Sequence, residues 1–298
     1  MRRTMGGLAA VVLLPASLAA AEVVVINDQA RFPEGPLVVG ETLYYVEYGG
    51  HTIVTWDGKE NKVLWTQEGC GPSALVQLAG GDFLVTCYDS GTIARVSAKG
   101  ETLANYDKDE AGGTLLGPND LTLDRKGGAY FTASGPWESA PIVGHVYRID
   151  ASGKIVSAAD DLHYANGIEL SHDGKTLYVI ESEAARVIQF QVAEDGSLSD
   201  RRLFFRHADA GVKHDWGPYP DGMKLDAKGN LFVGHYSAGQ ILVIDPEGKV
   251  LSEITVPSPA APNLAFSADG GTIFVMAVDD TANAPYLGKV YAVTNPAK

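Results

Sequence analysis

One pattern recurs six times along this chain, and the repetition restricts the fold more than any other feature of the sequence. Each copy has a turn-forming dipeptide, then one polar residue, a short strand-like run, a tight turn with glycine and a second apolar run. The polar residues of successive copies are 39 to 55 positions apart. They are Glu34, Ser73, Asn119, Asn166, Asp221 and Asn263. A period of this length with several short strands per copy is typical of β-propellers.

The fifth copy indicates how many strands each repeat contains. We expect strands at residues 223–225, 231–233, 241–244 and 250–256, with turns rich in glycine and aspartate between them. No stretch of the chain keeps a helical period. The sequence therefore predicts an all-β, six-bladed β-propeller made of four-stranded antiparallel blades.

The two ends of the repeat region suggest how the propeller closes. The sixth copy stops after 289–293, one strand short of a full blade, and residues 22–26 form a strand-like run with no blade of their own. We expect this N-terminal strand to complete the sixth blade, which removes an open sheet edge. Residues 22–298 then form one propeller domain.

The first 21 residues differ in kind from the repeats. Arg2 and Arg3 precede an apolar run at 8–14, and Ala19, Ala20 and Ala21 offer a small-residue cleavage site. This arrangement predicts a secretory signal peptide over 1–21, too short for a membrane span. The expected location of the protein is therefore periplasmic or secreted.

The charge of the chain excludes some classes of partner. It has 23 Lys and Arg against 37 Asp and Glu, a formal net charge of −14. Nucleic acids and anionic membranes require a basic surface, so neither is expected as a partner. We expect a monomer that acts on a small molecule.

The two cysteines, Cys70 and Cys87, both lie in apolar strand-like runs. Export permits a disulfide, but two cysteines alone imply no disulfide framework. The pattern favours two buried thiols.

The polar residue of each copy starts the innermost strand of its blade, so the six are expected to form a ring in the central channel. One explanation is that they cap strand starts and hold buried water. That explanation does not account for two carboxylates among amides around one axis, where like charges repel unless a cation lies between them. Glu34, Asn119, Asn166 and Asp221 are thus candidate metal ligands. Oxygen donors favour calcium, with zinc, manganese and magnesium as alternatives.

Four segments that contain these residues resemble the senescence marker protein/gluconolactonase family, which includes regucalcin-like proteins. The segments are 32–36, 117–121, 166–174 and 220–226. The resemblance covers the whole chain after the leader, and residues 231–241 are also similar to bacterial lactonases of that family.

The resemblance implies a six-bladed propeller with one catalytic divalent metal, most often calcium, held by the four candidate ligands. It also implies hydrolysis of sugar lactones, with Asp221 as the catalytic base toward water. Some animal members have an arginine that holds a sugar acid two residues before Asn119. This chain has Gly117 there, which argues against gluconolactone itself as the substrate.

Loops on the same side as the ring are expected to select the substrate. Trp137 either stacks on the substrate or packs against its own loop, and His51 and His235 are either proton-transfer groups or structural histidines. The candidate substrate-binding residues are Asn119, Asp120, His51, Trp137, His235 and Tyr236.

Two other functions remain open. The propeller could bind a ligand without catalysis, or the same metal site could hydrolyse phosphotriesters. The chain contains neither the Gly-x-Ser-x-Gly motif of serine hydrolases nor the His-Glu-x-x-His motif of zinc peptidases.

Overall fold

The computed structural model describes residues 22–137, 142–210 and 219–298. The expected signal peptide at 1–21 lies outside these ranges. The regular structure of the described chain is antiparallel β-sheet apart from two short 3-10 helices, η1 (Tyr48–Gly50) and η2 (His207–Ala210). None of the helices described is long and apolar enough to cross a membrane.

Within the described residues, four sheets have four strands each, and each sheet is a meander of consecutive strands. The first consists of β2 (Pro33–Val39), β3 (Thr42–Glu47), β4 (Thr52–Trp56) and β5 (Asn61–Thr66). The second consists of β6 (Pro72–Gln77), β7 (Phe83–Cys87), β8 (Thr92–Val96) and β9 (Thr102–Tyr106). The third consists of β10 (Pro118–Leu123), β11 (Ala129–Ala133), β12 (Gly144–Ile149) and β13 (Ile155–Leu162). The fourth consists of β14 (Ala165–Leu170), β15 (Thr176–Glu181), β16 (Arg186–Val192) and β17 (Leu198–Arg206).

The remaining described strands form one sheet of eight strands that curls around the ring. One part is β18 (Pro220–Leu225), β19 (Leu231–His235), β20 (Gln240–Ile244) and β21 (Val250–Thr255). The other part is β22 (Ala260–Phe266), β23 (Thr272–Val278), β24 (Leu287–Thr294) and β1 (Val23–Arg31). A single residue pair between β19 and β22, His235 with Ala261, joins the two parts.

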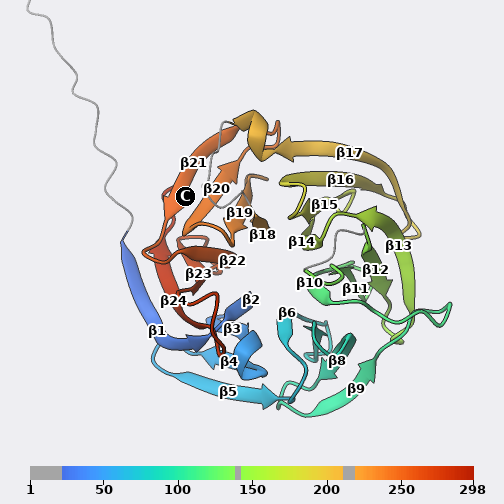
Figure 1. Cartoon of the computed structure of the whole chain (residues 1–298), viewed down its shortest axis with the longest axis horizontal. Coiled ribbons are helices and arrows are strands. Elements are labelled where there is room, and N and C mark those ends of the chain that lie inside the picture. The colour runs from blue at the N-terminus through green and yellow to red at the C-terminus, as the bar shows by residue number, and fades with distance from the viewer. Residues whose placement is uncertain (1–21, 138–141, 211–218) are drawn as a thin grey trace, which may run out of the picture.

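The sheets stand around a central axis, as in a β-propeller (Figure 1). The first strand of each meander lies innermost, and β2, β6, β10, β14, β18 and β22 follow one another around the axis. The core lies between neighbouring sheets, because apolar side chains of one sheet pack against those of the next. Leu84 and Ile93, for example, share a cluster with Phe131 and Ile149. No sheet could bury both of its faces alone, so the ring folds as one unit.

The N-terminal strand closes the ring as expected. β1 pairs antiparallel with β24, with Val23 opposite Val293 and Val25 opposite Tyr291. The first described strand thus covers the outer edge of the last one, and Ala30 is fully buried between the first and last sheets. The strands expected in the fifth copy are also present, as β18 to β21.

Candidate active site

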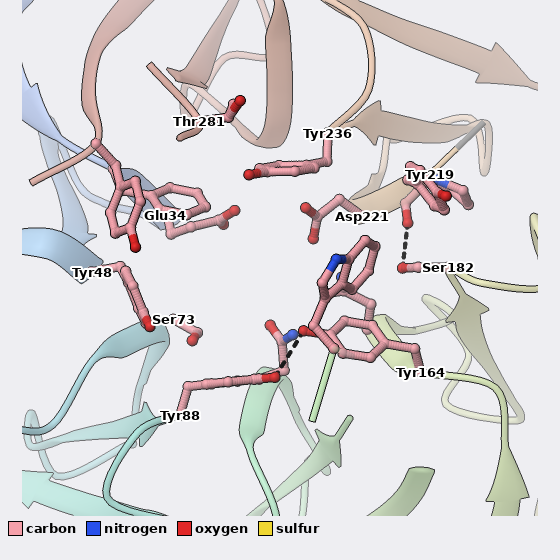
Figure 2. A pocket seen from close by; sticks show the side chains of 16 residues that line it. Glu34, Tyr48, Ser73, Tyr88, Tyr164, Ser182, Tyr219, Asp221, Tyr236 and Thr281 are labelled. Carbon is pink, nitrogen blue, oxygen red and sulfur yellow. Dashed lines mark hydrogen bonds between the residues drawn. The ribbon is translucent and has the colours of Figure 1, made fainter. Parts of the chain in front are cut away.

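A cavity of about 410 Å³ lies at the centre of the ring, and its floor contains most of the predicted polar ring (Figure 2). The residues concerned are Glu34, Ser73, Asn119, Asn166 and Asp221, each on an innermost strand. The sixth ring residue, Asn263, lies behind the floor, where its Nδ2 donates a hydrogen bond to Glu34 Oε2 at 3.0 Å. Strands far apart in sequence therefore bring all the predicted ligands to one place.

A backbone irregularity aims these side chains at the axis. Every innermost strand changes register with its neighbour at or beside the polar residue, for example between Glu34 and Leu37 in β2 and between Pro220 and Met223 in β18. The same shift occurs in β6, β10, β14 and β22. Such bulges redirect single side chains and are common beside functional sites.

Hydrogen bonds fix the floor residues so that oxygen atoms remain available. Glu34 Oε2 accepts from the backbone N–H of Gly35 at 2.9 Å as well as from Asn263. The amide nitrogen of Asn119 donates to Ser134 Oγ at 2.9 Å, which leaves its carbonyl oxygen for a ligand. Asn166 is hydrogen-bonded to Asp221.

Hydroxyl groups at the ends of three second strands bond to the innermost strand of the following sheet, β10, β14 or β18. Ser134 Oγ donates to the carbonyl of Ala165 at 2.6 Å, and Thr132 Oγ1 donates to that of Asn166, also at 2.6 Å. Ser182 Oγ donates to the carbonyl of Pro220 at 2.5 Å (Figure 2). Thr86 does the same for the carbonyl of Asn119. These bonds hold the floor residues in register, which a site with fixed geometry needs.

The floor concentrates negative charge. Burial raises the pKa of Glu34 well above its ordinary value, and the charge of Asp221 raises it further. Burial also raises the pKa of Asp221 to about 8, with Asp120 as the next cause. Asp221 is enclosed by protein except where it meets the cavity, so both carboxylates lack the water that normally stabilises their charge.

Asp120 lies under the floor and not in the cavity. It lines a second cavity of about 300 Å³ with Glu169 and Lys224. Its side chain is 3% exposed, and burial raises its pKa. Lys224 Nζ is 3.6 Å from Glu169 Oε2. Burial alone lowers the pKa of Lys224, but Asp120 and Glu169 together raise it, so this lysine is a cation between acids.

The structure separates the remaining candidate substrate-binding residues into two groups. Trp137 and Tyr236 line the cavity. His51 and His235 are not among its lining residues. His51 Nδ1 accepts a hydrogen bond from the backbone N–H of Gly71 at 3.2 Å, and His235 is buried with its Nε2 2.7 Å from that of His207. Both rings thus contact groups outside the described lining of the cavity.

An aromatic belt above the floor was not predicted from the sequence. One arc consists of Phe32, Tyr48, Tyr236 and Tyr286, with ring centroids 5.4 to 6.2 Å apart in contacting pairs. The other arc consists of Trp137, Tyr164 and Tyr219, with contacting centroids 4.7 and 5.2 Å apart. Tyr88 links the arcs, because its ring contacts Tyr48 and its hydroxyl lies 3.0 Å from that of Tyr164. Three of these residues directly precede an innermost strand. The repeat in the sequence therefore already marks part of the belt.

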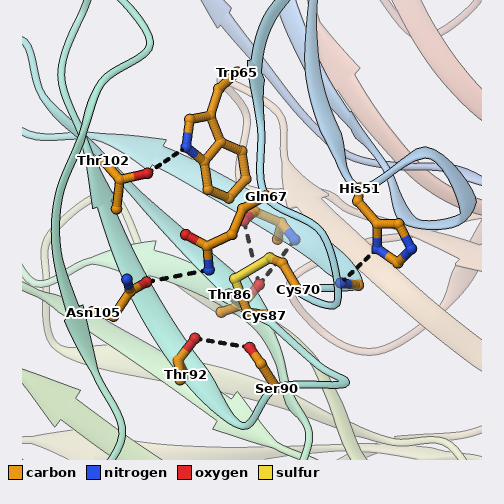
Figure 3. The surroundings of a disulfide bond; sticks show 12 residues. His51, Trp65, Gln67, Cys70, Thr86, Cys87, Ser90, Thr92, Thr102 and Asn105 are labelled. Carbon is orange, nitrogen blue, oxygen red and sulfur yellow. Dashed lines mark hydrogen bonds between the residues drawn. A yellow bond between two sulfur atoms is a disulfide. The ribbon is translucent and has the colours of Figure 1, made fainter.

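The expectation of two buried thiols is wrong, because Cys70 and Cys87 form a disulfide (Figure 3). Cys87 ends β7 opposite Pro72 of β6, so hairpin pairing brings it beside Cys70, with 4.6 Å between the Cα atoms. The bond lies next to the cavity wall, since the N–H of Tyr88 donates to the carbonyl of Gly71 at 2.9 Å. Pairing of this kind depends on strand register, which apolar patterning alone does not reveal.

Known proteins match this chain, some of them over nearly its whole length. Regucalcin of Xenopus laevis is 25% identical over 288 residues, covering 91% of this chain and 93% of that protein. Lactonase drp35 of Staphylococcus saprophyticus is 31% identical over 182 residues, covering 58% of this chain and 53% of that protein. The solved structure of a gluconolactonase from Xanthomonas campestris superposes with a TM-score of 0.73 at 25% identity, covering 94% of this chain and 93% of that chain. Residues 32–279 match the family described as the SMP-30/Gluconolactonase/LRE-like region, and the chain belongs to that family.

Proposed function

We propose that this protein is a metal-dependent lactonase that opens a cyclic ester with water. The observation that carries the proposal is the pair of enclosed carboxylates, Glu34 and Asp221, set among amide oxygens on the floor of a small-molecule cavity. The relatives named lactonase and gluconolactonase support the same reaction. The product would be a hydroxy acid.

The floor residues fit a divalent cation. Glu34 and Asp221 supply two negative charges, and Asn119 and Asn166 supply amide oxygens, a donor set of hard oxygens that suits calcium. Among the residues described, no group of three or more His, Cys, Asp and Glu side chains is arranged to hold a metal. The proposed site does not require one, because two of its four ligands are amides. When bound, the cation would polarise the lactone carbonyl and stabilise negative charge on its oxygen.

The chain itself contributes positioning and proton transfer. Asp221 accepts a proton from water as the water oxygen bonds to the carbonyl carbon, and the ring C–O bond then breaks. The leaving alkoxide takes up that proton, which balances the reaction. Asn166 orients Asp221 through its hydrogen bond, and Ser134 orients Asn119.

We propose that the ring has six blades. The eight-stranded sheet divides into β18–β21 and β22–β24 with β1, and only the pair of His235 and Ala261 joins the two parts. Each part then has four strands, like the other sheets. An experimental structure with a continuous hydrogen-bonded ladder between β19 and β22 would contradict this count.

We also propose that the protein is exported and acts as a monomer. The basic, apolar and small-residue segments of 1–21 support cleavage before Glu22. N-terminal sequencing of the protein recovered from the periplasm or medium of a bacterial host tests this, and an uncleaved cytoplasmic product contradicts it. Light scattering should give the mass of one chain.

Removal of the metal tests the function. The protein is treated with a chelator, then assayed with lactones, aryl esters and organophosphates before and after calcium is restored. We expect lactone hydrolysis that disappears with the chelator and returns with calcium. Activity on organophosphates alone would indicate a phosphotriesterase, and no activity on any substrate would indicate a binding protein.

One matched pair of substitutions tests the role of Asp221. Asp221→Asn should reduce kcat by about 100-fold or more, because it removes the base and one ligand charge. Asp226→Asn makes the same change in the turn after β18, where Asp226 Oδ1 accepts from the N–H groups of Lys228 and Asn230. This control should keep its activity. Unchanged turnover in Asp221→Asn contradicts the assignment.

A further inference from the structure

The walls of the cavity differ sharply from its floor. The floor holds the carboxylates and amides, whereas the wall above it is the aromatic belt. No Lys, Arg or His is among the described residues that line the cavity. A ligand bound here therefore meets oxygen atoms at one end and aromatic rings around its other end.

Backbone strain shows that the rings are not a by-product of the fold. Phe32 and Tyr164 have φ angles of 50° and 54°, in the left-handed region that costs non-glycine residues about 1–2 kcal/mol each. Gly71 and Gly117 occupy the equivalent positions of two other sheets, with φ angles of 57° and 62°. Glycine thus satisfies the same turn without strain, so Phe32 and Tyr164 are present for their side chains. Strain of this kind gathers at functional sites.

The two glycines make room for the same belt. A Cβ atom on Gly71 would lie 2.4 Å from the Asp89 carboxylate, which accepts from the Tyr48 hydroxyl, and 2.9 Å from the Tyr48 ring, and one on Gly117 would lie 2.8 Å from the ring of Tyr88. Five of the six innermost strand starts therefore either carry an aromatic ring, as at Phe32, Tyr164 and Tyr219, or lie under one, as at Gly71 and Gly117. At Gly117, the ring of Tyr88 takes the space that a side chain would need.

Two hydroxyl groups of the belt already donate within the protein and so do not donate to a ligand. The Tyr48 hydroxyl already donates to Asp89 at 2.8 Å, and the Tyr88 hydroxyl donates to the carbonyl of Gly135 at 2.8 Å. Sugar hydroxyls need many polar partners, and each one buried without a partner costs about 1–3 kcal/mol. Flat apolar groups gain instead, because ring pairs contribute about 0.5–1.5 kcal/mol beyond their buried area.

We propose that the aromatic belt selects lactones that carry an aromatic or similarly flat apolar substituent over sugar lactones. The inference rests on the proposed lactonase function. The lactone carbonyl lies at the polar floor, and the substituent lies between the arc of Phe32 and the arc of Trp137.

Three δ-lactones with aliphatic leaving groups separate ring binding from intrinsic reactivity. They are δ-valerolactone, 4-phenyl-δ-valerolactone and glucono-δ-lactone. With calcium present, we expect kcat/KM for the phenyl lactone to exceed that for each of the others by about tenfold or more, the equivalent of 1.4 kcal/mol. Equal values, or a preference for glucono-δ-lactone, overturn the inference and leave the lactonase function intact. Hydrolysis of none of them overturns the function instead.

A binding measurement tests the inference without turnover. The lactams 2-piperidone and 4-phenyl-2-piperidone resemble two of the substrates but are not expected to be hydrolysed. Calorimetric titration should give a dissociation constant about tenfold lower for the phenyl lactam. Equal dissociation constants overturn the inference even if no lactone is hydrolysed.

Substitutions in the two arcs locate the effect. Phe32→Gly removes a ring and relieves the strained φ, so it should fold at least as well as the natural chain. Trp137→Ala removes a ring that is 42% exposed. Both should reduce the preference for the phenyl lactone over δ-valerolactone by about fivefold or more. Trp56→Ala is the control, because Trp56 contacts Phe274 outside the cavity, and its preference should not change. An unchanged preference in both arc variants overturns the inference.

Discussion

Glu34 and Asp221 point toward each other across the cavity floor, although 187 positions separate them in the chain (Figure 2). Burial raises the pKa of both carboxyl groups; the charge of Asp221 raises that of Glu34 further, and the charge of Asp120 raises that of Asp221 further. Asn263 donates to Glu34 and Asn166 bonds to Asp221, which offsets part of these increases. Two acids kept together in this way are most stable when protonated or when a cation binds between them.

The metal-free protein should lose stability as pH rises from about 4 to about 8. The folded-state pKa of Asp221 is raised from 3.8 to about 8, so its contribution to stability is complete below the unfolded value and lost as pH rises through the folded one. Exposed acids such as Asp269 have lowered pKa values, so they change the stability of the protein only at pH values below this range.

Thermal unfolding with chelator and with calcium, at about pH 5 and about pH 8, measures this effect. We expect calcium to raise Tm at both values and by more at the higher one, because more carboxylate is then available to bind it. Calcium should not change the Tm of the double variant Glu34→Gln/Asp221→Asn. A Tm that calcium does not change at either pH contradicts the proposed site.

The sequence allowed the repeat, the closure and the polar ring to be predicted, because each depends on spacing alone. Residues that start equivalent strands of a propeller must lie at one level, whatever the blades contain. For that reason the spacing alone places Glu34, Asn119, Asn166 and Asp221 at one level of the ring. The closing pair of β1 and β24 followed from counting strands, and Val23 does lie opposite Val293.

Contacts that depend on exact register or on loop paths were not predictable in this way. Asp120 follows Asn119 in the chain, yet alternation places it below the floor with Lys224. His51 follows a 3-10 turn that directs its ring to the backbone of Gly71. The aromatic belt combines strand starts with loop residues such as Tyr286, whose position no repeat specifies.

Lys224→Met should destabilise the protein strongly. Lys224 is the cation beside Asp120 and Glu169 under the floor. Its removal leaves these two acids without the positive charge that stabilises their ionised forms. The side chains of Lys224 and Glu169 are 22% and 18% exposed, so the loss should stay below the roughly 3–5 kcal/mol that breaking a fully buried ion pair costs. Urea unfolding at neutral pH measures the loss, and Lys228→Met, an exposed lysine four residues later, is the control with an expected change below about 1 kcal/mol. Equal stabilities of the two variants would exclude an electrostatic role for Lys224.

The disulfide should contribute measurably to stability. Cys70 and Cys87 are 17 positions apart, and a bond that closes a loop of this size typically contributes about 2–4 kcal/mol. Cys70→Ser/Cys87→Ser should therefore lower the free energy of unfolding by about that amount. A reducing agent should shift the natural protein to the same value and leave the variant unchanged. A natural protein indifferent to reduction would show that the bond adds no stability.

Removal of β1 should open the ring. β24 would then expose its backbone N–H and C=O groups along the edge that Val23–Arg31 now covers, and the apolar cluster around Ala30 would lose a buried partner. Exposed edges of this kind pair with other chains, so a chain starting at Phe32 should unfold at a lower temperature and form larger species on size exclusion. A chain starting at Glu22 keeps β1 and should remain monomeric, with the full Tm. If the two chains behave alike, the closure contributes nothing to stability, and the ring is held by contacts between neighbouring sheets alone.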